Sequence, residues 1–154
     1  MTSNHPCEEC GAQLHQGSYV KRTRVGRYRV EDDSQTVPIC VKDHPELTIE
    51  DLAGYERRAA VVVLSEAADV GGAEIRFARK SLGLTQARLA ALMDVAPETV
   101  SRWETGSEAM SRVSRLALLA IVVGFDSRRM AEGLARFETN ALARTAEVLH
   151  VRAA

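Results

Sequence analysis

The 154-residue chain has few cysteines and no long apolar run, and both shortages exclude classes of protein. Its longest apolar stretches, AAVVVL and LALLAIVVGF, fall short of the about 20 apolar residues that cross a bilayer, so we expect no membrane span. Three cysteines cannot all pair, which argues against a disulfide-stabilised secreted domain. The N-terminus shows no charged-then-apolar leader, and we therefore expect a cytoplasmic protein.

The sequence also lacks internal repeats, low-complexity tracts, a glycine-rich phosphate loop and a defensible nucleophile–base pair, so we expect no enzyme. The stretch PCEEC, residues 6–10, matches the second half of the zinc deaminase signature. That chemistry also needs an upstream H-x-E, and only five residues precede Pro6. We therefore expect no catalytic zinc of that kind.

The net charge of −1 is unevenly distributed along the chain. Residues 1–71 carry 8 Lys and Arg against 12 Asp and Glu, whereas residues 72–154 carry 12 against 9. A weakly basic C-terminal half permits contact with nucleic acid. The basic run KRTRVGRYR, residues 21–29, is either a second phosphate-binding or partner surface or the solvated face of a hairpin, offset by the acidic residues 31–33.

The chain contains four residues of metal-binding type in the order C-x2-C-x29-C-x3-H. They are Cys7, Cys10, Cys40 and His44. Zn²⁺ takes four thiolate or imidazole ligands in a tetrahedron. The first 47 residues have few apolar side chains to build a core, so a structural metal would supply stability that burial does not. The other interpretation is a CxxC that binds nothing, with Cys40 as a small buried apolar residue.

The identity of the fourth ligand is open between two neighbouring residues. Asp43 occupies the position where a second CxxC would place its cysteine, and His44 follows it. Carboxylates are rarer than imidazoles in structural zinc sites, so we favour His44. His5 and His15 flank the first half-site as weaker substitutes.

Around these ligands, residues 1–47 show short β-type segments. SYVKRTRV and RYRVED flank Gly26 and predict a hairpin, and TVPIC would return the chain to the second half-site. Residues 48–71 predict a linker helix capped by Thr48 with Asp51, and the glycine pair at 71–72 marks the boundary. One face of that helix would carry Leu52, Tyr55, Ala59, Val62 and Val63. The rest of the chain has no strand signal and predicts several helices.

The stretch LGLTQARLAALMDVAPETVSRWETGSE, residues 82–108, predicts two short helices joined by a tight turn. Thr85 can cap the first helix, and Asp94 takes the turn because Asp tolerates left-handed geometry. Pro97 suits the first turn of the second helix, which the glycine of ETG would end. The residues expected to face the core are Leu89, Ala90, Leu92, Met93, Val100 and Trp103.

A generic helical bundle does not require this order of cap, small residue, tight turn, buried Trp and exposed Arg. The stretch resembles the Xre/Cro-type helix-turn-helix family, whose members often read close to LTQ..LA.L..V....VSRWE.G, and the likeness covers about residues 73–124. The family's usual Ser at the start of the second helix is Ala96 here. The resemblance implies binding of double-stranded DNA through Thr85, Gln86, Glu98, Thr99, Ser101 and Arg102.

Within that set the resemblance implies different roles. Gln86 and Ser101 would hold phosphates, while Thr99 and Arg102 would contact bases or backbone. Glu98 either accepts from cytosine N4 or favours the helix N-terminus through the helix dipole, and we prefer the second role.

After Gly124 the segment DSRRMAEGLARFETNALARTAEVLHV predicts an amphipathic helix capped by Asp126 or Ser127. Its apolar stripe would consist of Met130, Leu134, Phe137, Ala141, Thr145 and Val148. This helix either folds back on the bundle or pairs with a second copy, as in the homodimers common among helix-turn-helix proteins.

Together these patterns predict an α+β protein. A small zinc-binding β domain, residues 1–47, is joined by a linker helix, residues 48–71, to an all-α helix-turn-helix bundle with a C-terminal helix, residues 72–154. The combination resembles the MqsA class of antitoxins, in which the zinc domain binds a toxin and the helix-turn-helix represses its own operon. We expect a sequence-specific DNA-binding transcriptional regulator, a repressor with structural Zn²⁺; the alternative is an antitoxin that neutralises a toxin through the N-terminal domain.

Overall fold

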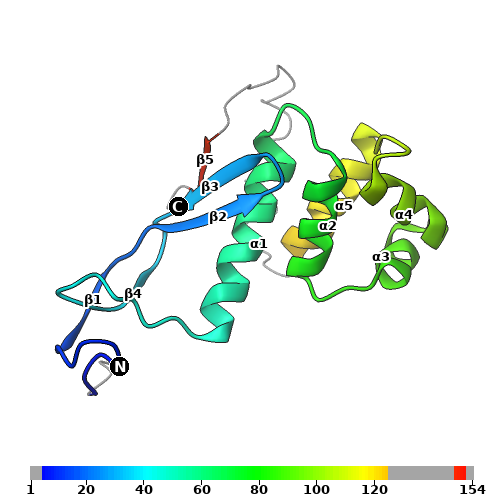
Figure 1. Ribbon diagram of the computed structural model, residues 1–154. Coiled ribbons are helices and arrows are strands. Elements are labelled where there is room, and N and C mark those ends of the chain that lie inside the picture. The colour runs from blue at the N-terminus through cyan, green and yellow to red at the C-terminus, as the bar shows by residue number, and fades with distance from the viewer. Residues whose placement is uncertain (1–4, 125–147, 152–154) are drawn as a thin grey trace.

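The computed structural model describes residues 5–124 and 148–151, in which strands come first, helices follow and one strand closes the chain (Figure 1). The strands are β1 (Leu14–Ser18), β2 (Lys21–Val25), β3 (Tyr28–Asp32), β4 (Thr36–Cys40) and β5 (Val148–Val151). The helices are α1 (Ile49–Glu66), α2 (Gly72–Ser81), α3 (Gln86–Met93), α4 (Pro97–Thr105) and α5 (Arg112–Gly124). Among the helices described, none is long and apolar enough to cross a membrane.

The N-terminal strands form two small sheets. Strands β2 and β3 make the predicted antiparallel hairpin, with Val25 opposite Tyr28 across a two-residue turn. Strand β4, the predicted TVPIC segment, pairs antiparallel with β1, so that Leu14 lies opposite Cys40. The chain passes from one sheet to the other twice, from β1 into β2 and from β3 into β4. The structure confirms α+β as the fold class.

The expectation that no strand follows residue 72 is wrong. Strand β5 pairs parallel to β3, from Arg29 opposite Val148 to Asp32 opposite Val151, and so returns the end of the chain to the N-terminal sheet. Val148 therefore lies in a strand and not on a helical stripe. Pairing partners more than a hundred residues apart leave no periodic signal in a short segment such as VLHV. The remainder of the predicted C-terminal helix and its cap lie outside the described residues.

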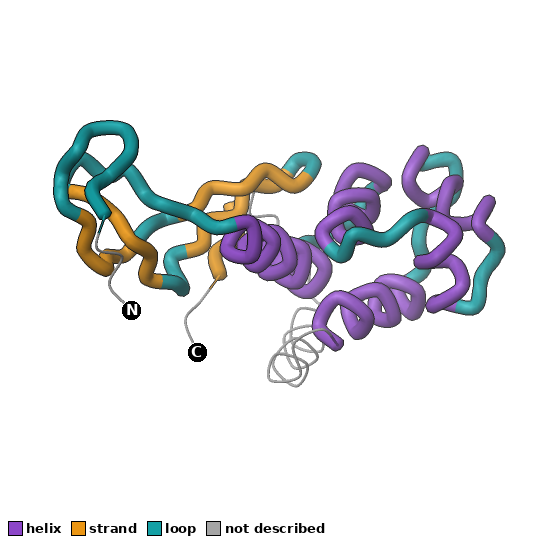
Figure 2. The backbone as a smooth tube through the Cα atoms, turned by 90° about the horizontal axis from the view of Figure 1, so that it is seen from below, coloured by secondary structure: helices purple, strands orange, loops and turns teal. Residues whose placement is uncertain are grey.

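Helix α1 is buried on two sides. Thr48 and Asp51 form the predicted capping box, in which Thr48 Oγ1 accepts from Asp51 N at 3.1 Å and Thr48 N donates to the Asp51 carboxylate at 2.9 Å. Figure 2 shows the strands on one side of this helix and the other helices on the opposite side. Of the five residues predicted to share one face, Leu52 is 38% exposed, because the helix extends beyond the strands at its first turn, and the other four are buried.

Each side of α1 belongs to a different core. Ala59, Val62, Val63 and Ala67 pack with strand residues Val25, Tyr28, Val30 and Val151. Ala60, Val61 and Leu64 pack with the core of the helical region, which includes Ile75, Leu89, Val100, Trp103 and Leu118. The continuous apolar run AAVVVL thus serves two cores at once. The proposed division of the chain at residues 47 and 71 stays a prediction.

The hairpin tip is joined to the helical region through Glu74 in the first turn of α2. Its carboxylate is buried and accepts from the backbone N–H of Arg27 at 3.0 Å and of Gly71 at 2.9 Å. Gly26 has φ +57°, and a Cβ there would lie 2.0 Å from Glu74 Oε1. The hairpin turn therefore needs glycine for its backbone conformation and for this close approach.

The C-terminal end of α1 is joined to α5 in a similar way. Arg115 donates to the carbonyl oxygens of Leu64 at 2.7 Å and Ala67 at 2.6 Å, which satisfies groups that a helix end leaves unpaired. Gly72 packs against the backbone of α4, where an added Cβ would lie 2.2 Å from the carbonyl oxygen of Glu104. The glycine pair at 71–72 is therefore a place of tight packing.

We predict that Gly26→Ala destabilises the protein by roughly 2–3 kcal/mol more than Gly83→Ala, since each hydrogen bond to a charged group contributes about 1.5–3 kcal/mol. Both glycines have positive φ, +57° and +66°, so both substitutions carry the same backbone strain. Only Gly26 faces Glu74, while nothing lies within 4 Å of a Cβ at Gly83. Urea unfolding measures the difference, and equal destabilisation would show that the hairpin contact with Glu74 contributes nothing.

Candidate metal centre and nucleic-acid interface

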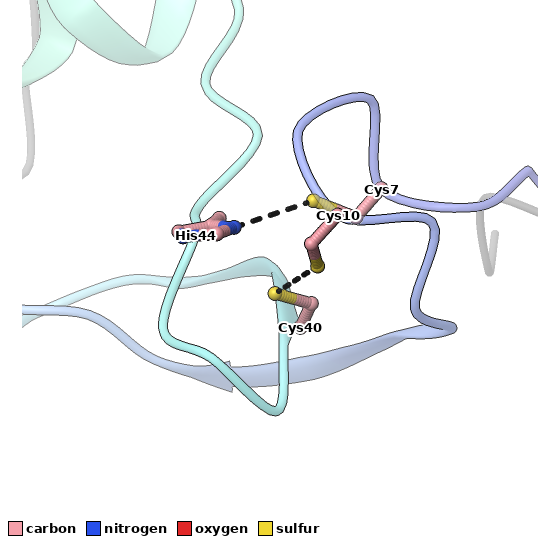
Figure 3. Close-up of side chains that lie close together, drawn as sticks. All are labelled: Cys7, Cys10, Cys40 and His44. Carbon is pink, nitrogen blue, oxygen red and sulfur yellow. Dashed lines mark hydrogen bonds between the residues drawn. The ribbon is translucent and has the colours of Figure 1, made fainter.

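Three thiols and one imidazole converge at the end of the molecule formed by β1 and β4. The ligand atoms of Cys7, Cys10, Cys40 and His44 all lie within 4.8 Å of one another (Figure 3). Cys10 Sγ is 3.5 Å from Cys40 Sγ, and Cys7 Sγ is 3.8 Å from His44 Nδ1. A tetrahedral Zn²⁺ with bonds of about 2.0–2.3 Å sets its ligand atoms roughly 3.5–3.8 Å apart. The donor set and its spacing therefore fit zinc.

Two turns and one strand pair build this cluster. In the first turn Gly11 N donates to Cys7 O at 2.8 Å, and Gly11 has φ +71°. In the second, Asp43 N donates to Cys40 O at 2.9 Å, and Asp43 has φ +60°. The pairing of β1 with β4 brings the two turns together.

The second turn explains the substituted ligand. Asp43 supplies the left-handed residue of the turn, which Asp tolerates, and His44 joins the cluster while Asp43 does not. Of the weaker substitutes, His5 lies 3.6 Å from Glu46 and His15 lies on β1, and neither belongs to the cluster. The four predicted ligands are thus brought together.

The surroundings of the cluster favour a thiolate at Cys40 and an oriented imidazole at His44. Burial raises the pKa of Cys40, but the backbone N–H groups of His44 and Lys42 donate toward its sulfur and the net shift is downward. His44 Nε2 lies 3.7 Å from a carboxylate oxygen of Glu9, and such a second partner orients the ring of a metal-binding histidine. With four protein ligands there is no open coordination position for a substrate, as in structural zinc sites.

The helix-turn-helix lies at the opposite end of the molecule from this cluster (Figure 1). Thr85 caps α3 as predicted, accepting from Arg88 N at 3.1 Å, and Asp94 follows α3 with φ +53°. Pro97 opens α4, and Gly106 ends it with φ +78°. Ala96 at the N-cap makes no side-chain hydrogen bond, in keeping with the absence of the family's usual Ser.

The burial of α3 and α4 follows the predicted pattern with one exception. Leu89, Ala90, Val100 and Trp103 are buried, and Met93 packs partly against the core. Leu92 was expected to face inward but is 47% exposed, because only one face of the short α3 contacts the bundle.

The predicted DNA-contacting residues lie on the opposite face of α4 and at the start of α3. Glu98 and Arg102 are exposed, and Thr99 and Ser101 are half-buried. Thr85 is exposed at the start of α3, and Gln86 beside it is half-buried. Their contacts with DNA stay predictions.

Sequence reasoning missed a buried carboxylate beneath this surface. The side chain of Glu104 is 1% exposed and accepts from Arg79 Nε at 2.6 Å and Nη2 at 3.1 Å. Gln86 Nε2 donates to it at 2.8 Å, and Arg76 Nε lies 3.5 Å away. This cluster ties α2 and the start of α3 to the end of α4. Residues 25 positions apart, such as Arg79 and Glu104, leave no local signal that could have revealed it.

The hydrogen bonds and charges around Glu104 lower its pKa by more than burial raises it. Desolvation raises the pKa of the Glu104 carboxyl, but hydrogen bonds from Arg79 and Gln86 and the charges of Arg79 and Arg76 lower it below its usual value. Gln86 is therefore held in place from below, with its amide group already engaged.

The basic run 21–29 also has a defined structure. Arg22, Thr23, Arg24, Arg29 and Glu31 line a groove of about 410 Å³ on the hairpin. Glu31 pairs with Arg22 at 3.1 Å, as the nearby acids were expected to do. Asp32 instead turns inward to Arg58 at 2.5 Å, so it does not offset the run.

Comparison with known proteins identifies one part of the chain. Residues 75–127 match the family model described as "Helix-turn-helix". No curated protein and no solved structure matches the chain. The match confirms an Xre-type helix-turn-helix domain in this part of the chain and supports a DNA-binding role in transcription regulation. It does not reach residues 1–74, so the resemblance to MqsA-class antitoxins stays a prediction.

We predict that Glu104→Gln destabilises the protein by about 3 kcal/mol near pH 7, because it leaves the Arg79 charge without its buried partner. The pKa of Glu104 is lowered in the folded state, so its stabilisation is present above the usual value of 4.5 and is lost as the pH falls through the folded value. The difference from the parent in chemical unfolding should shrink below about pH 4.5. Glu98→Gln, on the exposed side of α4, serves as control; equal effects of the two would contradict the assignment.

We also predict that His44→Ala weakens zinc retention far more than Asp43→Ala. His44 supplies a ligand atom, whereas Asp43 supplies only a turn conformation. Loss of a ligand is expected to weaken binding by tenfold or more, since even partners behind the ligands contribute 10–100-fold. Competition with a chromogenic chelator measures the ranking, and the reverse order would make Asp43 the fourth ligand.

Proposed function

We propose that the protein is a sequence-specific transcriptional regulator that binds double-stranded DNA and acts as a repressor, with a structural Zn²⁺ at its N-terminal end. The observation that carries this proposal is the exposed face of α4. Glu98, Thr99, Ser101 and Arg102 lie opposite the buried Val100 and Trp103, as the recognition helix of such a domain requires.

In the proposed mode of binding, α4 enters the major groove. Arg102 reads a base edge or the backbone with Thr99, and Ser101 contacts phosphate. Gln86, which Glu104 holds in place, lies next to Thr85 and brings the start of α3 to the DNA backbone. Glu98 stabilises the N-terminus of α4 through the helix dipole. A homodimer would place two such helices about one DNA turn apart, and coverage of a promoter would block transcription.

The metal centre has a supporting role in this proposal. Zn²⁺ held by Cys7, Cys10, Cys40 and His44 would link the two turns that precede β1 and follow β4. The apolar core on the strand side of α1 takes its strand residues from β2, β3 and β5 and none from β1 or β4, so the ligand residues would hold together a region that packing alone stabilises weakly.

One observation favours a second function, neutralisation of a toxin. The arginine-lined groove on the hairpin lies away from α4, so a protein partner could bind there while α4 holds DNA (Figure 1). A toxin-like reading frame beside the gene, whose product co-purifies with the protein, would support this alternative. Co-purification should then fail on substitution of Arg24 or Arg29 and survive substitution of Arg102.

The test of the main proposal is selection from a random duplex library, followed by fluorescence anisotropy with the recovered duplex and a scrambled one. Specific regulators prefer their site by on the order of 10³ or more, and their affinity falls as salt rises. Equal binding to both duplexes that moderate salt abolishes would contradict sequence-specific regulation.

We predict that Arg102→Ala lowers the preference for the selected duplex by roughly 10- to 100-fold, because a bidentate base contact provides about 1–3 kcal/mol of discrimination. Since Arg102 is exposed, the melting temperature should not change. Arg22→Ala removes the same charge from β2, which lies away from α4 (Figure 1), and serves as control. If the two variants have the same preference as the parent, α4 is not the recognition helix.

A further inference from the structure

The segment that follows α4 folds back onto Arg102. Glu108 N donates to the carbonyl oxygen of Arg102 at 3.3 Å, and the hydroxyls of Thr105 and Ser107 donate to the same oxygen at 3.2 and 3.3 Å. Gly106, with φ +78°, makes this reversal possible. Three donors on one carbonyl fix the backbone of Glu108 relative to Arg102.

The side chains of the two residues meet as well. Arg102 Nε lies 3.1 Å from Glu108 Oε2, and Arg102 Nη2 donates to Thr99 Oγ1 at 3.3 Å. Both side chains of the ion pair are about half-exposed, at 55% and 45%. The guanidinium of Arg102 is therefore held between α4 and the segment behind it.

This arrangement leaves a particular edge of Arg102 available. A guanidinium has five N–H donors in a rigid plane, and a bidentate contact to guanine O6 and N7 uses two of them. With Nε in an ion pair with Glu108 at 3.1 Å, the Nη1 and Nη2 end can still make that contact once Nη2 leaves Thr99. A carboxylate beside the guanidinium also repels a phosphate that approaches the same place.

We propose that Glu108 is a specificity-determining residue that positions Arg102 for a base edge and opposes its capture by phosphate. This inference rests on the proposed function, in which α4 is the recognition helix. Glu108 contacts no DNA itself in this proposal. It acts through Arg102, by orienting the guanidinium in the specific complex and by weakening non-specific complexes.

The experiment measures the ratio of affinities for a selected and a scrambled duplex by anisotropy, using full-length protein. An exposed ion pair contributes enough for about a two- to fivefold change in an equilibrium. Glu108→Gln should tighten binding to the scrambled duplex by that factor without tightening the selected one, so the ratio falls. Glu56→Gln removes the same charge from an exposed position of α1, outside the DNA-binding face, and should leave the ratio unchanged.

Two further variants separate positioning from charge. Glu108→Asp keeps the charge but shortens the side chain, and it should lower the ratio, whereas a purely electrostatic effect would leave the ratio at the parent value. In an Arg102→Met background, Glu108→Gln should leave the ratio unchanged. Thermal unfolding of each variant should match its parent, because the side chains are exposed.

The outcomes distinguish this proposal from the one on which it rests. If the parent prefers the selected duplex but Glu108→Gln shifts both duplexes equally, or still lowers the ratio without Arg102, the role of Glu108 is overturned and sequence-specific regulation stands. If the parent prefers no duplex, the proposed function fails and the role of Glu108 fails with it.

Discussion

The burial of α1 on two sides is the constraint on which the rest of the structure depends. Its strand-facing side chains, such as Val62 and Val63, close one core, and Val61 and Leu64 close the other. Neighbouring residues of α1 belong to different cores. Separating either the small sheets or the helical bundle from α1 would therefore expose apolar side chains to water. The buried carboxylate of Glu74 and the guanidinium of Arg115 then fix the orientation of the two parts.

This constraint connects the two ends of the molecule. The metal cluster and α4 lie far apart (Figure 1), but the chain runs from Cys40, at the end of β4, to the capped start of α1, and the end of α1 contacts α5. A partner on the hairpin therefore acts on the sheet that packs directly against α1, whereas a metal at the cluster acts on the β1–β4 sheet, whose strands continue into the hairpin. Any effect on DNA binding would pass through packed helices and through Glu74, without a flexible linker between the parts.

The features predicted from the sequence are those whose cause is local. The capping box at Thr48, the left-handed Asp94, the turn around Gly26 and the buried Trp103 each follow from a few neighbouring residues, and the structure confirms them. The four residues of the Cys3His cluster were predicted together because ligand chemistry and knuckle spacing are local too. The features missed are non-local: β5 on β3, the Arg79–Glu104 pair and the Glu74 junction each join residues far apart in sequence. The prediction that Leu92 faces inward was wrong for a related reason, since hydrophobic periodicity does not show how wide a face a short helix buries.

The distribution of charge on the DNA-binding side supports discrimination over general attraction. The chain carries a net charge of −1, and α4 with its following segment presents Glu98 and Glu108 beside Arg102. Non-specific affinity for DNA comes almost entirely from neutralised phosphates, so a surface on which two carboxylates accompany Arg102 gains little from it. Binding by such a surface must draw on contacts that only a matching site completes. The buried Glu104 serves the same end, because it holds Gln86 and the helices in place before DNA arrives, and a pre-organised surface loses less entropy on binding.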